Sequence, residues 1–317
     1  MTTTENLSGR TIATYRLLER VGEGGTATVY QAEHPERGKC AVKILRQRSR
    51  SDPVAVKRFL REAGFGSRVE HANVVRTYDY GEAEGLYYLA LEWADGESLA
   101  DFAKRDGPLE PPLVAHIAQQ LAGALAAAHA QGIIHRDLKP ENIVYDARTR
   151  TAKLLDFGIA RDAEEDPAER LTRTGFFVGS LNYVAPEALS GALVGEAADI
   201  YSLATIMYYL LTGEHPHAGR SPREVFQQLL TQPARPIRQT ATGARLSEAV
   251  EAVIMQSLSR DPAARHPSVR AFADDLSQAA TAAPRAPGAP PGSPPPGERR
   301  GGVLGALKSM FGRKPEA

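Results

Sequence analysis

The feature that most constrains this chain is a run near its middle, His135-Arg136-Asp137-Leu138-Lys139-Pro140-Glu141-Asn142, followed by Asp156-Phe157-Gly158. The first segment places a carboxylate, an ammonium group and an amide on one short loop, and the second adds a carboxylate after an apolar pair. Phosphoryl transfer requires this inventory, namely metal ligands, cations beside the phosphates and an acceptor that orients the attacking hydroxyl. The spacing therefore predicts a site for a magnesium-bound triphosphate.

The spacing H-R-D-L-K-x-x-N followed by D-F-G resembles the catalytic core of the protein kinases, and more narrowly the bacterial eukaryotic-like serine/threonine kinases. The resemblance covers roughly residues 15 to 278. It implies an α+β, bilobal protein-kinase fold. A small lobe over 12–94 would hold an antiparallel sheet and one helix, and a larger, mainly helical lobe would span 95–278.

Composition limits the alternatives. The chain has 317 residues, of which 42% are apolar, enough for a two-lobed core. A formal net charge of zero argues against nucleic-acid binding by phosphate neutralisation. The single cysteine, Cys40, excludes an internal disulfide framework, suits a cytoplasmic location, and is expected to be a buried thiol. Neither a signal-peptide pattern nor an apolar stretch of membrane-spanning length is present in the sequence.

A glycine-rich segment follows a strand predicted from Tyr15 to Val21 and reads Gly22-Glu23-Gly24-Gly25-Thr26-Ala27-Thr28-Val29. It resembles the kinase phosphate loop, with Ala27 in place of the third glycine. Glycines let backbone N–H groups approach phosphate oxygens without a Cβ in the way. By resemblance, the ATP contacts from this lobe are Val21, Gly22, Glu23, Gly24, Gly25, Val29, Ala41 and Lys43.

Lys43 lies on the next predicted strand, Cys40 to Leu45, where the kinase family has its phosphate-contacting lysine. The resemblance implies that it pairs with a glutamate of the helix predicted over 53–69. Glu62 is the preferred partner and Glu70 is the alternative, although Glu70 follows the apolar positions of that helix.

Two further strands are predicted at 74–80 and 86–93, joined by a turn at Glu84-Gly85. The second strand leads into a segment that resembles the hinge between kinase lobes. Leu91 would be the gatekeeper, and the carbonyl group of Glu92 and the amide of Ala94 would bind the adenine edge.

In the catalytic loop, the resemblance makes Asp137 the acceptor of the substrate hydroxyl and puts Lys139 beside the γ-phosphate. Asn142 and Asp156 would be the metal ligands, with Mg²⁺ the expected ion and Mn²⁺ an acceptable one, because both prefer oxygen donors. A lysine two residues after the aspartate is the serine/threonine form of the loop.

The segment from Asp156 to Glu187 resembles the kinase activation segment. Thr172 and Thr174 lie where the bacterial family is autophosphorylated. Arg136 would need an anion, which a phosphothreonine supplies, and Arg161 would add a second contact. The alternative is two ordinary exposed threonines. Ser180 stands where the family usually has threonine.

Other residues of the predicted large lobe have structural roles. Glu187 should pair with Arg265, and Asp199 should accept backbone N–H groups of the catalytic loop. His116 and His129, on the helix predicted from Pro111 to about Gln131, are expected to be packing or surface residues rather than ligands. His215-Pro216-His217 is predicted to be a solvated loop, because no third metal ligand is near in sequence.

Three segments fall outside this domain, namely a polar arm over 1–11, an Ala/Pro/Gly-rich linker over 279–300, and a short basic amphipathic segment over 301–317. In the last segment Val303, Leu304, Leu307, Met310 and Phe311 share a helical face. That pattern suits docking to a membrane surface or a protein, with a disordered tail as the alternative.

The leading hypothesis is an ATP-dependent kinase of protein serine and threonine hydroxyls, activated by autophosphorylation, with another copy of itself as one substrate. A nucleotide-binding pseudokinase is the second hypothesis, although all four of Lys43, Asp137, Asn142 and Asp156 are present. A small-molecule kinase is the third, and Ala185-Pro186-Glu187 argues against it by its resemblance to a peptide-docking platform.

Overall fold

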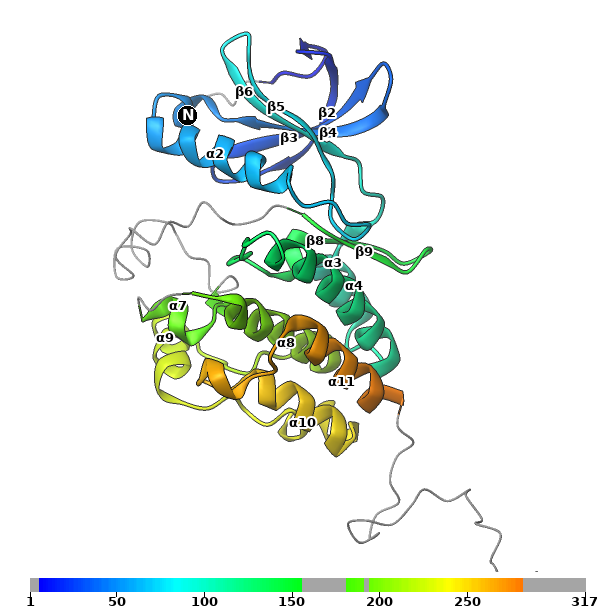
Figure 1. Ribbon diagram of the computed structural model, residues 1–317, viewed down its shortest axis with the longest axis vertical. Helices are drawn as coiled ribbons and strands as arrows, with labels where there is room; N and C mark the ends of the chain where they lie inside the picture. The colour runs from blue at the N-terminus through cyan, green and yellow to red at the C-terminus, as the bar shows by residue number, and fades with distance from the viewer. Residues whose placement is uncertain (1–5, 156–180, 191–193, 282–317) are drawn as a thin grey trace, which may run out of the picture. The chain divides into compact units, whose positions relative to one another are not determined.

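The computed structural model describes residues 6–155, 181–190 and 194–281. The small lobe contains a sheet whose strands follow the order β1-β2-β3-β4-β6-β5, and every neighbouring pair is antiparallel (Figure 1). Its elements are β1 (Thr11–Ile12), β2 (Tyr15–Glu23), β3 (Ala27–His34), β4 (Gly38–Leu45), α1 (Gln47–Arg50), α2 (Pro53–Gly66), β5 (Thr77–Ala83) and β6 (Leu86–Glu92).

The start of the chain differs from the prediction of a polar arm over residues 1–11. Leu7 is buried, and its backbone amide donates a hydrogen bond to the Tyr30 hydroxyl at 3.2 Å. Thr11 begins β1, and Ile12 is fully buried with Tyr15 and Leu17. Isolated apolar residues between polar ones gave no periodic signal, yet each of them fills the core on one face of the sheet.

Helix α2 begins as the sequence predicts but ends earlier. The Asp52 side chain accepts the amide of Val54, and Pro53 occupies the first turn, where its missing N–H has no cost. The predicted end at Val69 is wrong, because the helix stops at Gly66 with Ser67 as its C-cap. A Cβ on Gly64 or Gly66 would lie 3.3 Å from the Tyr80 hydroxyl or 3.2 Å from Thr77 Oγ1, so these glycines allow close packing on β5.

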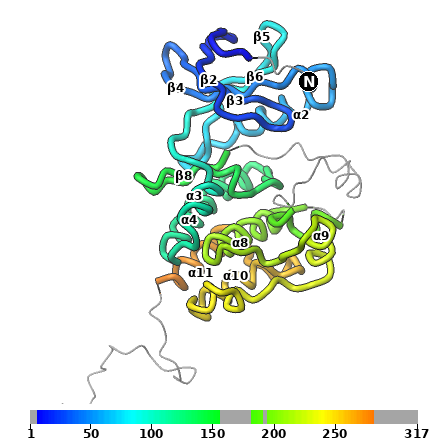
Figure 2. Tube along the Cα trace, turned by 180° about the vertical axis from the view of Figure 1, so that it is seen from behind, coloured from blue at the N-terminus to red at the C-terminus, as the bar shows by residue number. Residues whose placement is uncertain are grey.

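The large lobe is mainly helical, with the short antiparallel sheet β7-β8-β9 on one side (Figures 1 and 2). Helix α8 is buried along nearly its whole length and packs on α4, α10 and α11. Its end is set by Gly213, which takes the left-handed conformation at φ 72°. The elements are β7 (Glu97–Ser98), α3 (Leu99–Asp106), α4 (Pro111–His129), β8 (Ile143–Asp146), β9 (Thr151–Leu154), α7 (Pro186–Leu189), α8 (Glu196–Thr212), α9 (Pro222–Thr231), α10 (Glu248–Ser257) and α11 (Val269–Thr281).

Backbone and amide hydrogen bonds join the segment before β5 to the large lobe. Leu154 donates to the carbonyl group of Asn73 at 2.8 Å, and Val75 donates to that of Leu154 at 2.9 Å. The Asn73 side chain donates to Gln120 Oε1 and to the Ala152 carbonyl group, both at 2.8 Å. This network fixes the start of β5 against α4 and β9.

The compact unit reaches Ala282, and α11 continues to Thr281, slightly past the boundary predicted at 278. The predicted linker over 279–300 therefore begins later, and the rest of it, like the amphipathic segment over 301–317, lies outside the described residues. Among the described residues, no helix is both long enough and apolar enough to span a membrane.

Candidate active site

Two side chains of one loop, Lys139 and Asn142, converge on the Asp137 carboxylate. Lys139 Nζ lies 3.0 Å from Asp137 Oδ2, and Asn142 Nδ2 donates to the Asp137 carbonyl group at 2.8 Å and to Oδ2 at 3.3 Å. All lie on the loop and the short 3-10 helix (Pro140–Asn142) that lead into β8. With 17% of its surface exposed, the Asp137 side chain is shielded but still reachable. The arrangement holds one carboxylate beside one cation.

The backbone of this loop is held by Asp199 from α8. The amides of His135 and Arg136 donate to the fully buried Asp199 carboxylate at 2.9 and 3.0 Å. Arg136 has φ 63°, an uncommon conformation for a residue with a Cβ. Two charge-assisted hydrogen bonds offset that conformational cost and fix the direction of the next residue, Asp137.

His129 is a residue whose role the sequence argument missed. Its side chain is buried at the end of α4, with Nε2 2.8 Å from Asp199 Oδ2 and Nδ1 3.5 Å from Glu196. It therefore orients the carboxylate that holds the catalytic loop. The contact links α4 and α8, and the repeat of apolar residues in α4 gives no sign of it.

In the small lobe, Lys43 from β4 and Glu62 from α2 form an ion pair at 3.0 Å. Both side chains are mostly buried, with 16% and 17% exposed. Glu70, the alternative partner, instead lies 3.9 Å from Arg76 on the surface. The pair ties the helix to the centre of the sheet.

The glycine-rich segment forms the turn between β2 and β3, closed by a hydrogen bond from the Gly24 amide to the Ala27 carbonyl group at 2.8 Å. A Cβ on Gly22 or Gly24 would make only ordinary contacts, and one on Gly25 would meet nothing within 4 Å. None of the three has a positive φ. The glycines are therefore not needed by the loop itself, and their value lies in leaving open space for a ligand at the backbone.

The predicted hinge follows β6. Ala41 pairs with Leu91 and Cys40 with Glu92 in the sheet, so the hinge begins beside the middle of β4. The Glu92 carboxylate forms an ion pair with Lys153 of β9 and accepts the amide of Arg76 at 3.2 Å. Lys39 lies over the Trp93 ring, 4.0 Å from its centroid. These contacts position the backbone groups of Glu92 and Ala94.

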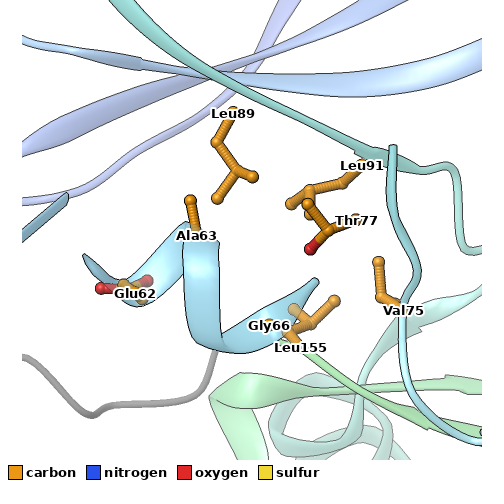
Figure 3. A pocket seen from close by; sticks show the side chains of 8 residues that line it. All are labelled: Glu62, Ala63, Gly66, Val75, Thr77, Leu89, Leu91 and Leu155. Atoms are coloured by element: carbon orange, nitrogen blue, oxygen red, sulfur yellow. The ribbon is translucent and has the colours of Figure 1, made fainter. Parts of the chain in front are cut away.

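Next to Leu91 lies a small pocket of about 20 Å³ between α2 and the strands β5 and β6 (Figure 3). It is lined mainly by apolar side chains, with the Thr77 hydroxyl turned into the space and Glu62 at one side. The lining residues are Glu62, Ala63, Gly66, Val75, Thr77, Leu89, Leu91 and Leu155. Leu91 therefore stands between this pocket and the hinge.

The residues present fit a magnesium-bound nucleotide. The loop glycines leave open space at the backbone, and Lys43 of β4 pairs with Val29 of β3, the strand that follows the loop. The amide nitrogen of Asn142 is bonded to Asp137, which leaves its amide oxygen as a hard donor. The backbone amide of Leu155, the residue before Asp156 in the sequence, donates to the Asn142 carbonyl group at 2.8 Å.

Several predicted residues lie outside the described part of the chain. They are Asp156, Arg161, Thr172, Thr174 and Ser180. Across the described residues, no cluster of three or more His, Cys, Asp or Glu side chains is arranged to hold a metal. The proposed magnesium ligands, Asn142 and Asp156, are one asparagine and one aspartate, and so do not form a cluster of that kind.

The ion pair predicted between Glu187 and Arg265 is present and deeply buried. Arg265 Nη1 and Nη2 donate to the two carboxylate oxygens at 2.7 and 2.8 Å, in bidentate geometry. Arg265 also donates to the carbonyl groups of Ala197 and Ser259 and lies over the Tyr201 ring. This arginine joins α7 to α8 and to the segment before α11.

The prediction of a solvated loop at His215 and His217 is wrong. His217 is 5% exposed, and His215 stacks on Tyr209 and lies 3.1 Å from the Tyr183 hydroxyl. Burial lowers the pKa of each imidazole to about 4, with the positive charge of Arg260 assisting at His217. Both rings are thus neutral packing groups at pH 7.

The sheet-and-helix small lobe, the helical large lobe and the loop around Asp137 define a protein kinase. The protein kinase domain family matches residues 15–276, and the chain belongs to this family.

Among curated proteins, the chain is similar to the serine/threonine-protein kinase pkn3 of Myxococcus xanthus, at 38% identity over 86% of this chain and 51% of the relative. It is 37% identical to the serine/threonine-protein kinase PknB of Mycobacterium tuberculosis over 87% of this chain and 44% of the relative. The chain thus spans about half or less of the length of these relatives.

Among solved structures, the kinase domain of Mycobacterium tuberculosis PknI superposes with a TM-score of 0.65 at 30% identity, covering 86% of this chain and 98% of that one. A structure of Rad53 in complex with AMP-PNP superposes with a TM-score of 0.68 at 26% identity, covering 83% and 65%.

Proposed function

We propose that this chain transfers the γ-phosphate of ATP to serine and threonine hydroxyls of proteins. The observation that carries the proposal is the loop in which Lys139 and Asn142 converge on the Asp137 carboxylate while Asp199 holds the loop from behind. The names of its kinase relatives, and the AMP-PNP complex of Rad53, support the same assignment.

Each residue has a defined task in this reaction. Asp137 accepts a hydrogen bond from the substrate hydroxyl, which aims its oxygen at the γ-phosphorus. A new P–O bond forms, the bond to the leaving ADP oxygen breaks, and the hydroxyl proton passes to Asp137. Lys139 neutralises charge on the transferred group. Lys43, oriented by Glu62, binds the remaining phosphates.

Asn142 and Asp156 would hold the divalent ion, Mg²⁺ or Mn²⁺, through oxygen atoms. When bound, the ion supplies positive charge to the phosphate oxygens. Adenine would bind the carbonyl group of Glu92 and the amide of Ala94, with Val21, Val29 and Ala41 covering its faces.

The test is transfer of radiolabel from ATP to a protein substrate by the wild-type chain and by Asp137→Asn. We expect the variant to lose activity by about 10²–10⁴-fold, the usual contribution of an acid–base residue, with an unchanged melting temperature. Asp106→Asn is the matched control, because Asp106 is an exposed aspartate at the end of α3. Near-wild-type transfer by Asp137→Asn would refute the assigned role.

The same experiment separates the alternatives. A pseudokinase would bind ATP without transferring label in either chain. A small-molecule kinase would label a metabolite but no protein. The complete set of Lys43, Asp137 and Asn142 in mutually supportive geometry favours turnover.

Activation by phosphorylation of Thr172 or Thr174 is part of the proposal. Its support is Arg136, whose buried Nε makes no hydrogen bond within the described residues. A buried guanidinium favours a nearby anion, and a phosphothreonine provides one, with Arg161 as a second contact. Mass spectrometry should detect phosphate at one of these threonines after incubation with ATP, and a double Thr172→Ala, Thr174→Ala variant should have lower activity.

The proposed setting is the cytoplasm, where ATP is available, with a second copy of the chain as one substrate in trans. Docking of residues 301–317 to a membrane surface or a protein is a further proposal. A chain ending at Ala280 would test it, and unchanged fractionation and partner recovery would refute it.

A further inference from the structure

Three successive carbonyl groups of the glycine-rich turn are bonded by the segment that follows β4. Arg46 Nη1 donates to Gly24 O at 3.2 Å, and Arg48 Nη2 donates to Gly25 O. The backbone amide of Arg46 donates to Thr26 O at 2.8 Å. The turn is thus held along its carbonyl side by residues that the sequence argument did not single out.

These bonds decide where the amides of the turn point. In a planar peptide unit the C=O and the N–H of the next residue point in opposite directions. Holding Gly24 O therefore directs the Gly25 amide away from Arg46, and holding Gly25 O directs the Thr26 amide away from Arg48. Because the glycines leave the turn flexible, side-chain contacts are needed to keep this orientation.

Arg46 is itself aimed by a carboxylate. Glu23 Oε1 lies 2.7 Å from Arg46 Nη1, and Glu23 Oε2 lies 2.9 Å from Arg20 Nη1. Only 20% of the Arg46 side chain is exposed, so the guanidinium is packed rather than free in solvent. The Glu23 side chain, predicted to be part of the ATP site, is thus engaged with two arginines.

We propose that Arg46 and Arg48 are positioning residues for nucleotide phosphates, acting through the carbonyl groups of Gly24 and Gly25. They keep the Gly25 and Thr26 amides facing the triphosphate before it binds. The inference rests on the proposed use of ATP. It predicts that the arginines affect binding of the phosphates and not of the nucleoside.

The test compares the full chain with its Arg46→Gln, Arg48→Gln double variant. Trp93, the only tryptophan of the sequence, adjoins the predicted adenine contacts and reports binding by its fluorescence. We expect the Kd for MgATP to rise on the order of 10-fold, the effect of losing two modest hydrogen bonds, while the Kd for adenosine changes by less than about 2-fold. The KM for ATP should rise with it, with a smaller change in kcat.

Amide hydrogen exchange of the nucleotide-free chain gives a second readout. Peptides covering residues 22–29 should exchange faster in the double variant, because the turn loses its supports. Arg16→Gln is the matched control, since Arg16 forms an exposed pair with Glu33 on the same sheet. That control should leave both readouts unchanged, with similar melting temperatures for all three proteins.

Each other outcome overturns the inference. Unchanged MgATP affinity, or an equal loss for adenosine, would remove the role in phosphate binding. Weaker MgATP binding with unchanged exchange would mean that the arginines contact phosphate directly. A wild-type chain that bound no MgATP would overturn the proposed function as well, whereas a wild-type chain that binds and transfers phosphate isolates the failure to the arginines.

Discussion

Two ion pairs of glutamate with a cation, one in each lobe, are built very differently. Arg265 and Glu187 in the large lobe are 0% and 10% exposed, bidentate, and supported by two carbonyl groups and an aromatic ring. Lys43 and Glu62 in the small lobe are 16% and 17% exposed and lie 3.0 Å apart, and Glu62 lies on a helix that buries only Phe59 and Ala63. The first pair is enclosed on all sides by the packed large lobe, whereas the second joins a helix with few buried residues to the sheet.

The largest expected effect is that of Arg265→Ala. The substitution leaves the buried Glu187 carboxylate without its partner, and breaking a buried pair in this way costs about 3–5 kcal/mol. Denaturant unfolding of the large lobe should show this loss. A cost below about 1 kcal/mol would remove the distinction between the two pairs.

The second-largest expected effect is a loss of stability of the large lobe as the pH falls. His215 and His217 have pKa values lowered from 6.5 to about 4 in the folded chain, so the unfolded state binds more protons between these limits. Their contribution to stability is complete above pH 6.5 and is lost as the pH falls toward 4, on the order of 3 kcal/mol for each ring.

Thermal unfolding between pH 7 and pH 4.5 measures this dependence. Replacing His217 with glutamine should flatten the profile, whatever its effect at pH 7. An equally steep profile would show that the acid sensitivity arises elsewhere.

For Glu62→Gln we expect a smaller loss of stability than for Arg265→Ala, because glutamine has nearly the shape of glutamate and keeps a side-chain oxygen that can accept from Lys43. Phosphate transfer should nevertheless fall on the order of 10²-fold, since Lys43 loses the carboxylate that orients it. Glu70→Gln, in the same region but paired only at the surface, is the control. Stability loss comparable with that of Arg265→Ala would contradict the comparison.

The smallest effect is expected for Gly66→Ala in α2. Alanine favours the helix by about 0.5–1 kcal/mol, and crowding of its Cβ against Thr77 Oγ1 at 3.2 Å offsets that gain. Gly96→Ala is the matched change beside the hinge, where φ is 118° and a Cβ would lie 2.4 Å from the Tyr145 carbonyl oxygen. Equal melting temperatures for the two variants would show that the contact between α2 and β5 tolerates an added Cβ no better than the backbone beside the hinge does.

The sequence predicted those parts of the fold and the site that depend on short motifs within one segment of the chain. The loop from His135 to Asn142, the strand with Lys43 and the helix with Glu62 each carry a short pattern, and the two lobes follow from the family resemblance. Helix α3 was not part of that prediction, although Ser98 caps it through the amide of Asp101.

What the sequence did not reveal depends on contacts between distant segments. His129 at the end of α4 contacts Asp199 on α8, and Lys153 on β9 contacts Glu92 at the end of β6. Arg46 and Arg48 look like ordinary surface cations until the turn is folded beside them. In each case the side chain is unremarkable in its own segment, and only the packed chain supplies its partner.

The state of Cys40 has a practical consequence. It is the only cysteine in the sequence, is fully buried, donates to the Ala32 carbonyl group, and has its pKa raised to about 11 by burial. A maleimide would therefore find no accessible native thiolate. Val54, 54% exposed on α2, offers a place where a Val54→Cys change would accept one spectroscopic label and report helix movement during turnover.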